Sequence, residues 1–233
     1  MPHLPIFMHL TKTAGGTLKE GIRQAAGMRP LFVYSPDALA EFDREEHNIV
    51  YGHMAFGVHA TLDIPPEYYC FLRHPWSRTI SHFHHLANND RSRVGDKMRR
   101  YDDINDFFRH GRHWEFENFM CRMLSGVADG DCEVDRLYEL AADNAVRHFR
   151  FIGFHEFFDL SVLKLSHCLG RRIRIRRNVN VGSYDRFSVN RRTADRIVAE
   201  NQADMRLYRF CLTQFLERFD SGRDFLLADS RPF

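Results

Sequence analysis

The sequence predicts an α/β protein in which a central parallel sheet is flanked by helices. Candidate strands and helices alternate in the first part of the chain, an order that favours parallel strands joined by helical crossovers. The strand candidates at residues 4–10 and 68–72 are short apolar runs. The first ends in a Gly-Gly turn and the second at Arg73-His74-Pro75, so each leads directly into a helix.

The expected elements follow one another along the chain. After the strand at 4–10, Thr17 and Glu20 stand three apart as in a capping box, which predicts a helix over 17–26. Strands are expected at 48–51 and 68–72, and Pro75 suits the first turn of a helix over 76–86. Residues 88–111 are polar and charged with few periodic apolar positions, so we expect a loop there. Helices are expected over 115–124, 134–149 and 157–169, a strand at 149–154, and one or two amphipathic helices over 193–219.

Length and composition indicate an ordinary soluble globular protein. With 233 residues, 44% hydrophobic and 27% charged, we expect residues 1–233 to form a single domain. No run approaches the roughly 20 apolar residues that cross a bilayer, and no signal peptide is visible. The five Cys are odd in number and scattered, which favours free thiols. These features favour a cytoplasmic protein, or the remainder of one that had a membrane anchor.

Two clusters of basic residues stand out against a net charge of +2. One extends from Arg91 to Arg100, and the other holds five Arg between Arg171 and Arg177. Such clusters attract phosphate, sulfate or a polyanion, although a solvated charged face is an equal alternative. Neither lies in a nucleic-acid-binding motif, so we expect no nucleic-acid partner.

The segment from Phe7 to Thr17 has the composition of an anion-binding turn. A strand that turns through Gly15-Gly16 into a helix presents backbone N–H groups at the positive end of the helix dipole. Lys12 adds a point charge, and neighbouring Thr hydroxyls add donors. Lys12 precedes the glycines, whereas a Walker loop places Lys after them. Taken alone, this segment could equally be an ordinary Gly-rich turn.

Two further strand ends carry polar side chains that could serve a reaction. Arg73 ends the strand at 68–72, and Ser77 and Ser81 follow on one face of the next helix. A guanidinium with a hydroxyl nearby is a receptor for a phosphate dianion. His53 follows Gly52 at the end of the strand at 48–51 and could accept a proton near neutral pH. The alternatives are a surface Arg and a structural His.

Together the three segments resemble the PAPS-dependent sulfotransferases of the carbohydrate and uronyl 2-O-sulfotransferase group, where PAPS is 3′-phosphoadenosine-5′-phosphosulfate. The family's phosphosulfate loop is similar to residues 11–17 (TKTAGGT), and its 3′-phosphate motif is similar to residues 73–81 (RHPWSRTIS). Gly52-His53 resembles a third family segment. Weaker similarities at 118–126, 151–156 and 204–208 extend the resemblance over nearly the whole chain.

This resemblance implies a P-loop nucleotide-kinase-like fold, PAPS as the donor and no catalytic metal. Lys12 and the amides of Thr13, Ala14, Gly15, Gly16, Thr17 and Leu18 would hold the phosphosulfate. Arg73 and Ser81 would hold the 3′-phosphate, and Ser183 would contact the nucleotide. His53 would act as general base and Lys12 would stabilise the leaving oxygen. The acceptor would be a hydroxyl, with a glycan or glycolipid as the leading expectation and an acidic one favoured by the basic clusters.

Several alternatives stay open at the level of sequence. Thr11 replaces the family's Pro, which should loosen the loop entrance, and His74 replaces an acid that often fixes the Arg. His82, His84 and His85 suggest a metal site, but the sequence offers no nearby carboxylate or Cys to complete it. A metal-dependent P-loop kinase and a catalytically silent nucleotide- or polyanion-binding module are the rival functions. Asn118 and Arg122 could face the acceptor or pair structurally.

Overall fold

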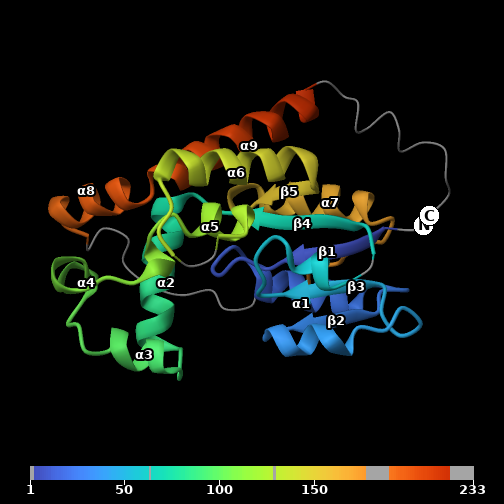
Figure 1. Cartoon of the computed structure of the whole chain (residues 1–233), viewed down its shortest axis with the longest axis horizontal. Helices are drawn as coiled ribbons and strands as arrows, with labels where there is room; N and C mark the ends of the chain where they lie inside the picture. The colour runs from blue at the N-terminus through green and yellow to red at the C-terminus, as the bar shows by residue number, and fades with distance from the viewer. Residues whose placement is uncertain (1–2, 63, 128–129, 177–188, 221–233) are drawn as a thin grey trace.

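The computed structural model describes residues 3–62, 64–127, 130–176 and 189–220 of the chain (Figure 1). Within these ranges one sheet has the order β2-β3-β1-β4-β5, and each pair of neighbouring strands is parallel. The strands are β1 (Leu4–Met8), β2 (Pro30–Val33), β3 (Ile49–Gly52), β4 (Pro66–Leu72) and β5 (Phe149–Phe154). The α/β class and the central parallel sheet flanked by helices are therefore confirmed.

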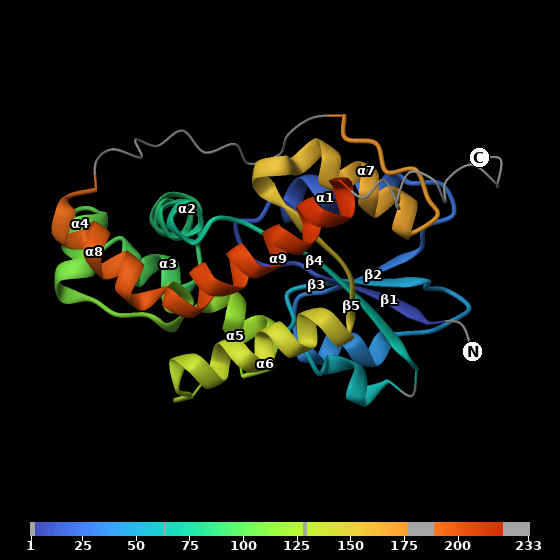
Figure 2. The same ribbon diagram turned by 90° about the horizontal axis from the view of Figure 1, so that it is seen from above.

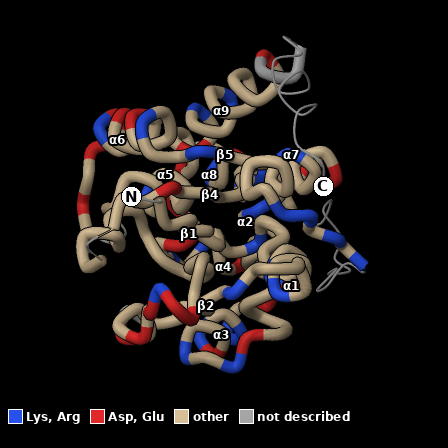
Figure 3. Tube along the Cα trace, turned by 90° about the vertical axis from the view of Figure 1, so that its right-hand side faces the viewer, with Lys and Arg blue, Asp and Glu red and all other residues tan. Residues whose placement is uncertain are grey.

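Helices cover both faces of this sheet. The helices α1 (Gly15–Gln24) and α7 (Phe158–Cys168) lie on one face, and α5 (Phe119–Ser125) and α6 (Val134–Arg147) lie on the other (Figures 2 and 3). The long helix α9 (Gln202–Asp220) packs against α6 and the β5 edge. Because both faces are covered, strands such as β4 have almost wholly buried apolar sequences.

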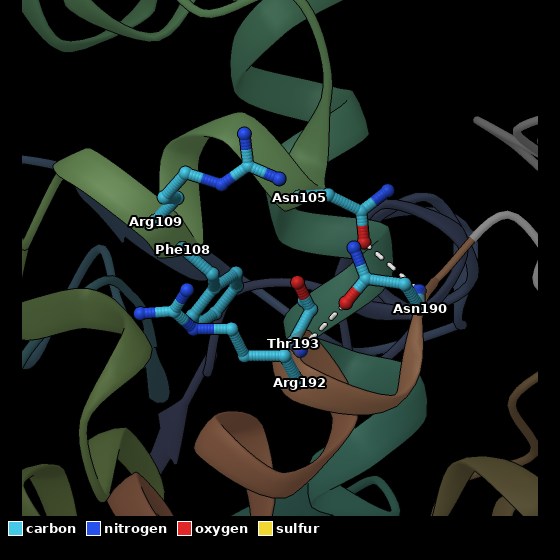
Figure 4. Close-up of a pocket in the computed structure, with 6 residues that line it drawn as sticks. All are labelled: Asn105, Phe108, Arg109, Asn190, Arg192 and Thr193. Atoms are coloured by element: carbon cyan, nitrogen blue, oxygen red, sulfur yellow. Dashed lines mark hydrogen bonds between the residues drawn. The ribbon is translucent and has the colours of Figure 1, made fainter.

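A helical lobe stands beside the sheet and has its own apolar cluster. It consists of α2 (Pro75–Asn88), α3 (Arg93–Met98), α4 (Ile104–His110) and α8 (Arg191–Glu200). Ile80, Met98, Phe107 and Ile197 are among its buried residues. Figure 4 shows where α4 meets the start of α8: the Asn190 amide donates to Asn105 Oδ1 at 2.9 Å.

The expectation of a loop over residues 88–111 is wrong, because this stretch contains α3 and α4. Ser92 and Asp103 cap the two helices by accepting hydrogen bonds from first-turn amides. Met98 and Phe107 then bury against α2. Each helix is only six or seven residues long, so its apolar side is too short to produce a periodic pattern.

Other boundaries differ by smaller amounts. β1 ends at Met8, two residues before the expected end, and β2 was not expected at all. The helix expected over 115–124 is divided into a 3₁₀ turn (Trp114–Phe116) and α5, because Asn118 adopts a left-handed φ of 48°. The tail forms two helices, α8 and α9, which agrees with the expectation of one or two.

The structure also bears on the cysteines and on membrane spanning. All five cysteines are free thiols, as the scattered spacing predicted. Among the helices of the described ranges, none combines the length and the apolar character that crossing a membrane requires.

Candidate functional site

The predicted functional segments meet at the carboxyl edge of the sheet. In the parallel register, Met8 of β1 is level with Gly52 of β3 and with Cys70 of β4. The loops that follow these three strands therefore leave the sheet at the same edge, where open α/β sheets hold ligands. The structure thus brings the Gly15-Gly16 turn, His53 and Arg73 to one edge, as the sequence predicted.

The turn between β1 and α1 has the backbone conformation of an anion-binding loop. Lys12 and Ala14 have left-handed φ values of 69° and 73°, which L-residues adopt only when the surroundings enforce them. The first amides of α1, from Gly15 and Gly16, have no acceptor within the helix itself. The amides of Thr17 and Leu18 both donate to the Ala14 carbonyl at 3.1 Å. The Thr13 hydroxyl donates to the Leu10 carbonyl at 2.8 Å, so it braces the loop.

Three cationic side chains converge on this turn. Arg73 Nη1 donates to the Lys12 carbonyl at 3.0 Å, and Arg78 Nη2 donates to the Thr11 hydroxyl at 2.7 Å. Burial, followed by the positive charges of Arg73 and Arg78, lowers the pKa of Lys12 to about 8. Three mutually repelling cations in one place favour the binding of a multiply charged anion between them.

Arg78 is a site residue to which the sequence gave no role. Its side chain is 1% exposed, lies 3.9 Å from the centre of the Phe119 ring, and donates to the carbonyls of Thr11 and Glu115. Burial lowers its pKa to about 10. Thr11, which stands where the family has Pro, provides both a carbonyl and a hydroxyl to Arg78. The entrance of the loop is therefore tied to α2 and is not loosened.

An open pocket of about 340 Å³ lies beside Arg73 and is lined also by Ser77, His155 and Glu156. Ser81 is buried one turn further along α2. Glu156 fixes the pocket wall by accepting the His74 amide at 2.9 Å and the Tyr208 hydroxyl at 3.1 Å. The His74 ring packs edge-on against Tyr208. Ser183, which was predicted to contact the nucleotide, lies outside the described residues.

His53 has the geometry of a neutral base. Its Nδ1 lies 2.9 Å from the His9 carbonyl, which can only accept, so Nδ1 carries the proton and Nε2 keeps its lone pair. Burial lowers the pKa of His53 below its usual 6.5. His53 as a residue is exposed to solvent, but two rings lie close to its imidazole: the His9 ring stacks on it with 4.3 Å between ring centres, and the Tyr34 ring centre lies 5.5 Å away.

The other predicted histidines belong to the helical lobe. His82 Nε2 lies 3.0 Å from Glu115 Oε2, and His113 Nδ1 lies 3.7 Å from the same oxygen. Burial would raise the pKa of Glu115, but the bond to His82 and the nearby charges hold it below the usual value. Burial lowers the pKa of His82 to about 4. Within the described ranges, no three His, Cys, Asp or Glu side chains form a group that could hold a metal.

Asn118 and Asp204 are structural residues that cap each other's helices. Asn118 Oδ1 accepts the amides of Ala203 and Asp204 at the start of α9. The Asp204 carboxylate, which is 1% exposed, accepts the amides of Met120 and Cys121 at the start of α5. Arg122 donates to backbone carbonyls as well. Structural pairing, one of the two alternatives for Asn118 and Arg122, is therefore what the structure shows.

Comparison with known proteins gives a likeness to solved structures but none at the level of sequence. No family model and no curated protein sequence matches the chain. Among solved structures, the mouse sulfotransferase SULT7A1 complexed with PAP is similar, with a TM-score of 0.43 and 12% sequence identity. The likeness covers 85% of this chain and 63% of the mouse protein, so the chain spans less than two thirds of that protein's length.

Proposed function

We propose that this protein is a sulfotransferase that moves a sulfuryl group from PAPS to an acceptor hydroxyl. The observation that carries the proposal is the convergence of Lys12, Arg73 and Arg78 on a Gly-rich turn, with the neutral His53 at the same sheet edge. A donor with phosphate at two places fits cations that extend from the turn to the pocket beside Arg73.

One end of the donor would bind where β1 ends and the other where the neighbouring strand β4 ends. Lys12 and the first amides of α1 would hold the phosphosulfate, since the amides and the helix dipole favour an anion there. Arg73 and Ser77 would hold the 3′-phosphate in the pocket that they line. Ser81 would contribute from the same helix, and a nucleotide contact by Ser183 stays a prediction from the family resemblance. The family resemblance of residues 11–17 and 73–81 supports this orientation.

The reaction would be an in-line displacement at sulfur. The acceptor oxygen forms the new O–S bond while the bond from sulfur to the 5′-phosphate oxygen breaks, and that oxygen keeps the electron pair. The acceptor proton moves to Nε2 of His53, and such positioned proton transfer contributes roughly 10²–10⁴ in rate. The Lys12 ammonium stabilises the charge on the leaving phosphate oxygen, a type of contact often worth about 3–4 kcal/mol.

The acceptor would approach from the β2 side of the edge. Tyr34 follows β2, is 49% exposed and lies next to His53, and Lys19 Nζ lies 4.6 Å from the Tyr34 ring centre. An exposed aromatic ring with a cation beside it suits a cyclic acceptor, and we propose a glycan or glycolipid, in line with the family resemblance. We propose that the protein acts in a reducing compartment such as the cytoplasm, because its five cysteines are free thiols.

The test combines binding of the product nucleotide with transfer of label. Titration calorimetry with adenosine 3′,5′-bisphosphate should show binding by the wild type and strongly weakened binding by Arg73→Ala. The matched control is Arg112→Ala, a change of an exposed Arg that pairs with Glu117. ³⁵S-labelled PAPS is then incubated with neutral and acidic oligosaccharides and with p-nitrophenol. No binding of the bisphosphate would overturn the proposal, and label on the phenol alone would overturn the glycan acceptor.

A further inference from the structure

The imidazole of His9 lies between the anion-binding turn and the base. Its ring stacks on the His53 ring with 4.3 Å between centres and 29° between planes. Its other edge meets Gly15 so closely that a Cβ on Gly15 would lie 1.8 Å from ring atoms Cδ2 and Nε2. One flat side chain therefore touches both the first residue of α1 and the proposed catalytic base.

The backbone of His9 holds the end of β3, and a β3 side chain in turn contacts the Gly-rich turn. Its carbonyl lies 2.9 Å from His53 Nδ1, and its amide donates to the Gly52 carbonyl at 2.8 Å. On the turn side, the Gly15 carbonyl accepts a bond from the Tyr51 hydroxyl at 2.6 Å. The Tyr51 ring lies 5.6 Å from the His9 ring. The turn, β1 and β3 thus form one packed unit with His9 at its centre.

The chemistry of the His9 ring fits a packing role better than proton transfer. Its Nδ1 is buried and has no hydrogen-bond partner. Burial first, and then the charges of His53, Lys19 and Lys12, lower the pKa of His9 to about 3. The ring is therefore neutral near pH 7, and it can lie among cations without adding a charge that repels them.

We propose that His9 is a positioning residue that fixes the distance and angle between the anion-binding turn and His53. This inference rests on the proposed function, because it presumes that the turn holds the sulfuryl donor and that His53 is the base. Gly15 is then a glycine because the His9 ring occupies the space of its side chain. Movement of the ring would separate the donor from the base, and a misplacement of about 1 Å can cost roughly 100-fold in rate.

The first test measures the pKa of His53 by NMR of ¹⁵N-labelled histidine, with the signal assigned through His53→Gln. The charged and titratable groups that face His53 are His9, Lys19, Glu115 and Tyr34, and all but His9 stay unchanged. In His9→Ala the His53 ring gains water on one face, so its pKa should rise toward about 6.5. In His9→Phe a flat ring remains, so the pKa should stay near the wild-type value.

The rate of transfer should follow the same pattern. His9→Ala should lower kcat about 10–100-fold and move the acidic limb of the pH profile upward, while His9→Phe should recover most of the rate. If His9→Ala does not fold, His9→Leu removes the flat ring but keeps the apolar bulk. If His53 keeps its wild-type pKa and the pH profile is unchanged in whichever of His9→Ala and His9→Leu folds, the inference is overturned.

The second test uses Gly15 as a partner in a double-mutant cycle. Gly15→Ala should weaken binding of adenosine 3′,5′-bisphosphate, because the new methyl group displaces the His9 ring or the turn. His9→Ala removes the atoms that clash, so the double variant should bind at least tenfold more tightly than Gly15→Ala alone. If the two substitutions changed the binding free energy by strictly additive amounts, the contact between His9 and Gly15 would have no role in binding. If the wild type fails to bind the bisphosphate, the proposed function is wrong. The NMR test still decides whether the His9 ring covers His53 and lowers its pKa.

Discussion

Under the proposed function, the pKa of Lys12 makes the affinity for adenosine 3′,5′-bisphosphate depend on pH in a defined direction. In the free protein, burial and two guanidinium groups lower this pKa to about 8, so the ammonium loses its proton on passing that value. A bound anion stabilises the ammonium and raises its pKa, so above pH 8 binding must take up a proton. The affinity should therefore fall as the pH rises through this range.

The size of the effect follows from the same pKa. Between about pH 7 and about pH 9 the protonated fraction of Lys12 falls from roughly nine tenths to one tenth, so Kd should rise about tenfold. Titration calorimetry with adenosine 3′,5′-bisphosphate in buffers of different ionisation heat measures both Kd and the protons taken up. The 3′-phosphate is already a dianion over this range, because its second pKa is near 6.

Two variants isolate the contribution of Lys12. Lys12→Met should weaken binding by about 1.5–3 kcal/mol at neutral pH and should abolish the pH dependence, since a charged hydrogen-bond partner is lost. Lys19→Met is the matched control, because it removes a nearby Lys of α1 whose ammonium lies against the rings of Phe32 and Tyr34 instead of in the turn. In this control, Kd should still rise with pH as it does in the wild type. A wild-type Kd that is constant between these pH values would refute the reasoning.

Three further predictions concern stability, and urea denaturation tests each. Thr11→Val removes the hydroxyl that Arg78 donates to and should cost about 1–3 kcal/mol, so an unchanged midpoint would contradict this bond. Asn118→Ala leaves two buried amides at the start of α9 unpaired and should lower the free energy of unfolding by about 2–4 kcal/mol. A loss below about 0.5 kcal/mol would show that water replaces the cap. Gly52→Ala would place its Cβ 1.7 Å from a backbone oxygen of β2 and should prevent folding, whereas Gly170→Ala, in open space at φ 60°, should cost only about 1 kcal/mol.

The parts of the fold that the sequence predicted are those with strong local signals. The strand at 68–72 is an apolar run between Pro66 and Pro75, and the strand at 149–154 is rich in Phe and Ile. Their observed counterparts β4 and β5 are mostly buried in the sheet. β2 has only four residues and begins with Pro30, so it forms because β3 provides a parallel neighbour. The helices α3 and α4 likewise depend on packing against α2, which no local pattern reveals.

In the candidate site, residues of short sequence motifs could likewise be predicted, whereas contacts between residues far apart in sequence could not. Lys12, Gly15 and Arg73 belong to short motifs whose residues lie next to each other in sequence, so they could be named in advance. The contacts of Arg78 join residues 67 positions apart, and they depend on how α2 packs against the turn. His9 was visible as part of the strand, but its role depends on the stacking of two rings that the fold brings together.

The reciprocal caps of α5 and α9 have a consequence for the order in which the molecule assembles during synthesis. The carboxylate that satisfies the start of α5 belongs to Asp204, 83 residues after Cys121, so it leaves the ribosome long after α5 does. Until then α5 has unpaired amides at its beginning, and Phe119, on which the Arg78 guanidinium rests, has no settled position. The nascent chain can therefore complete β1 to β5 early, yet it cannot fix the cationic side chains in place until α9 docks.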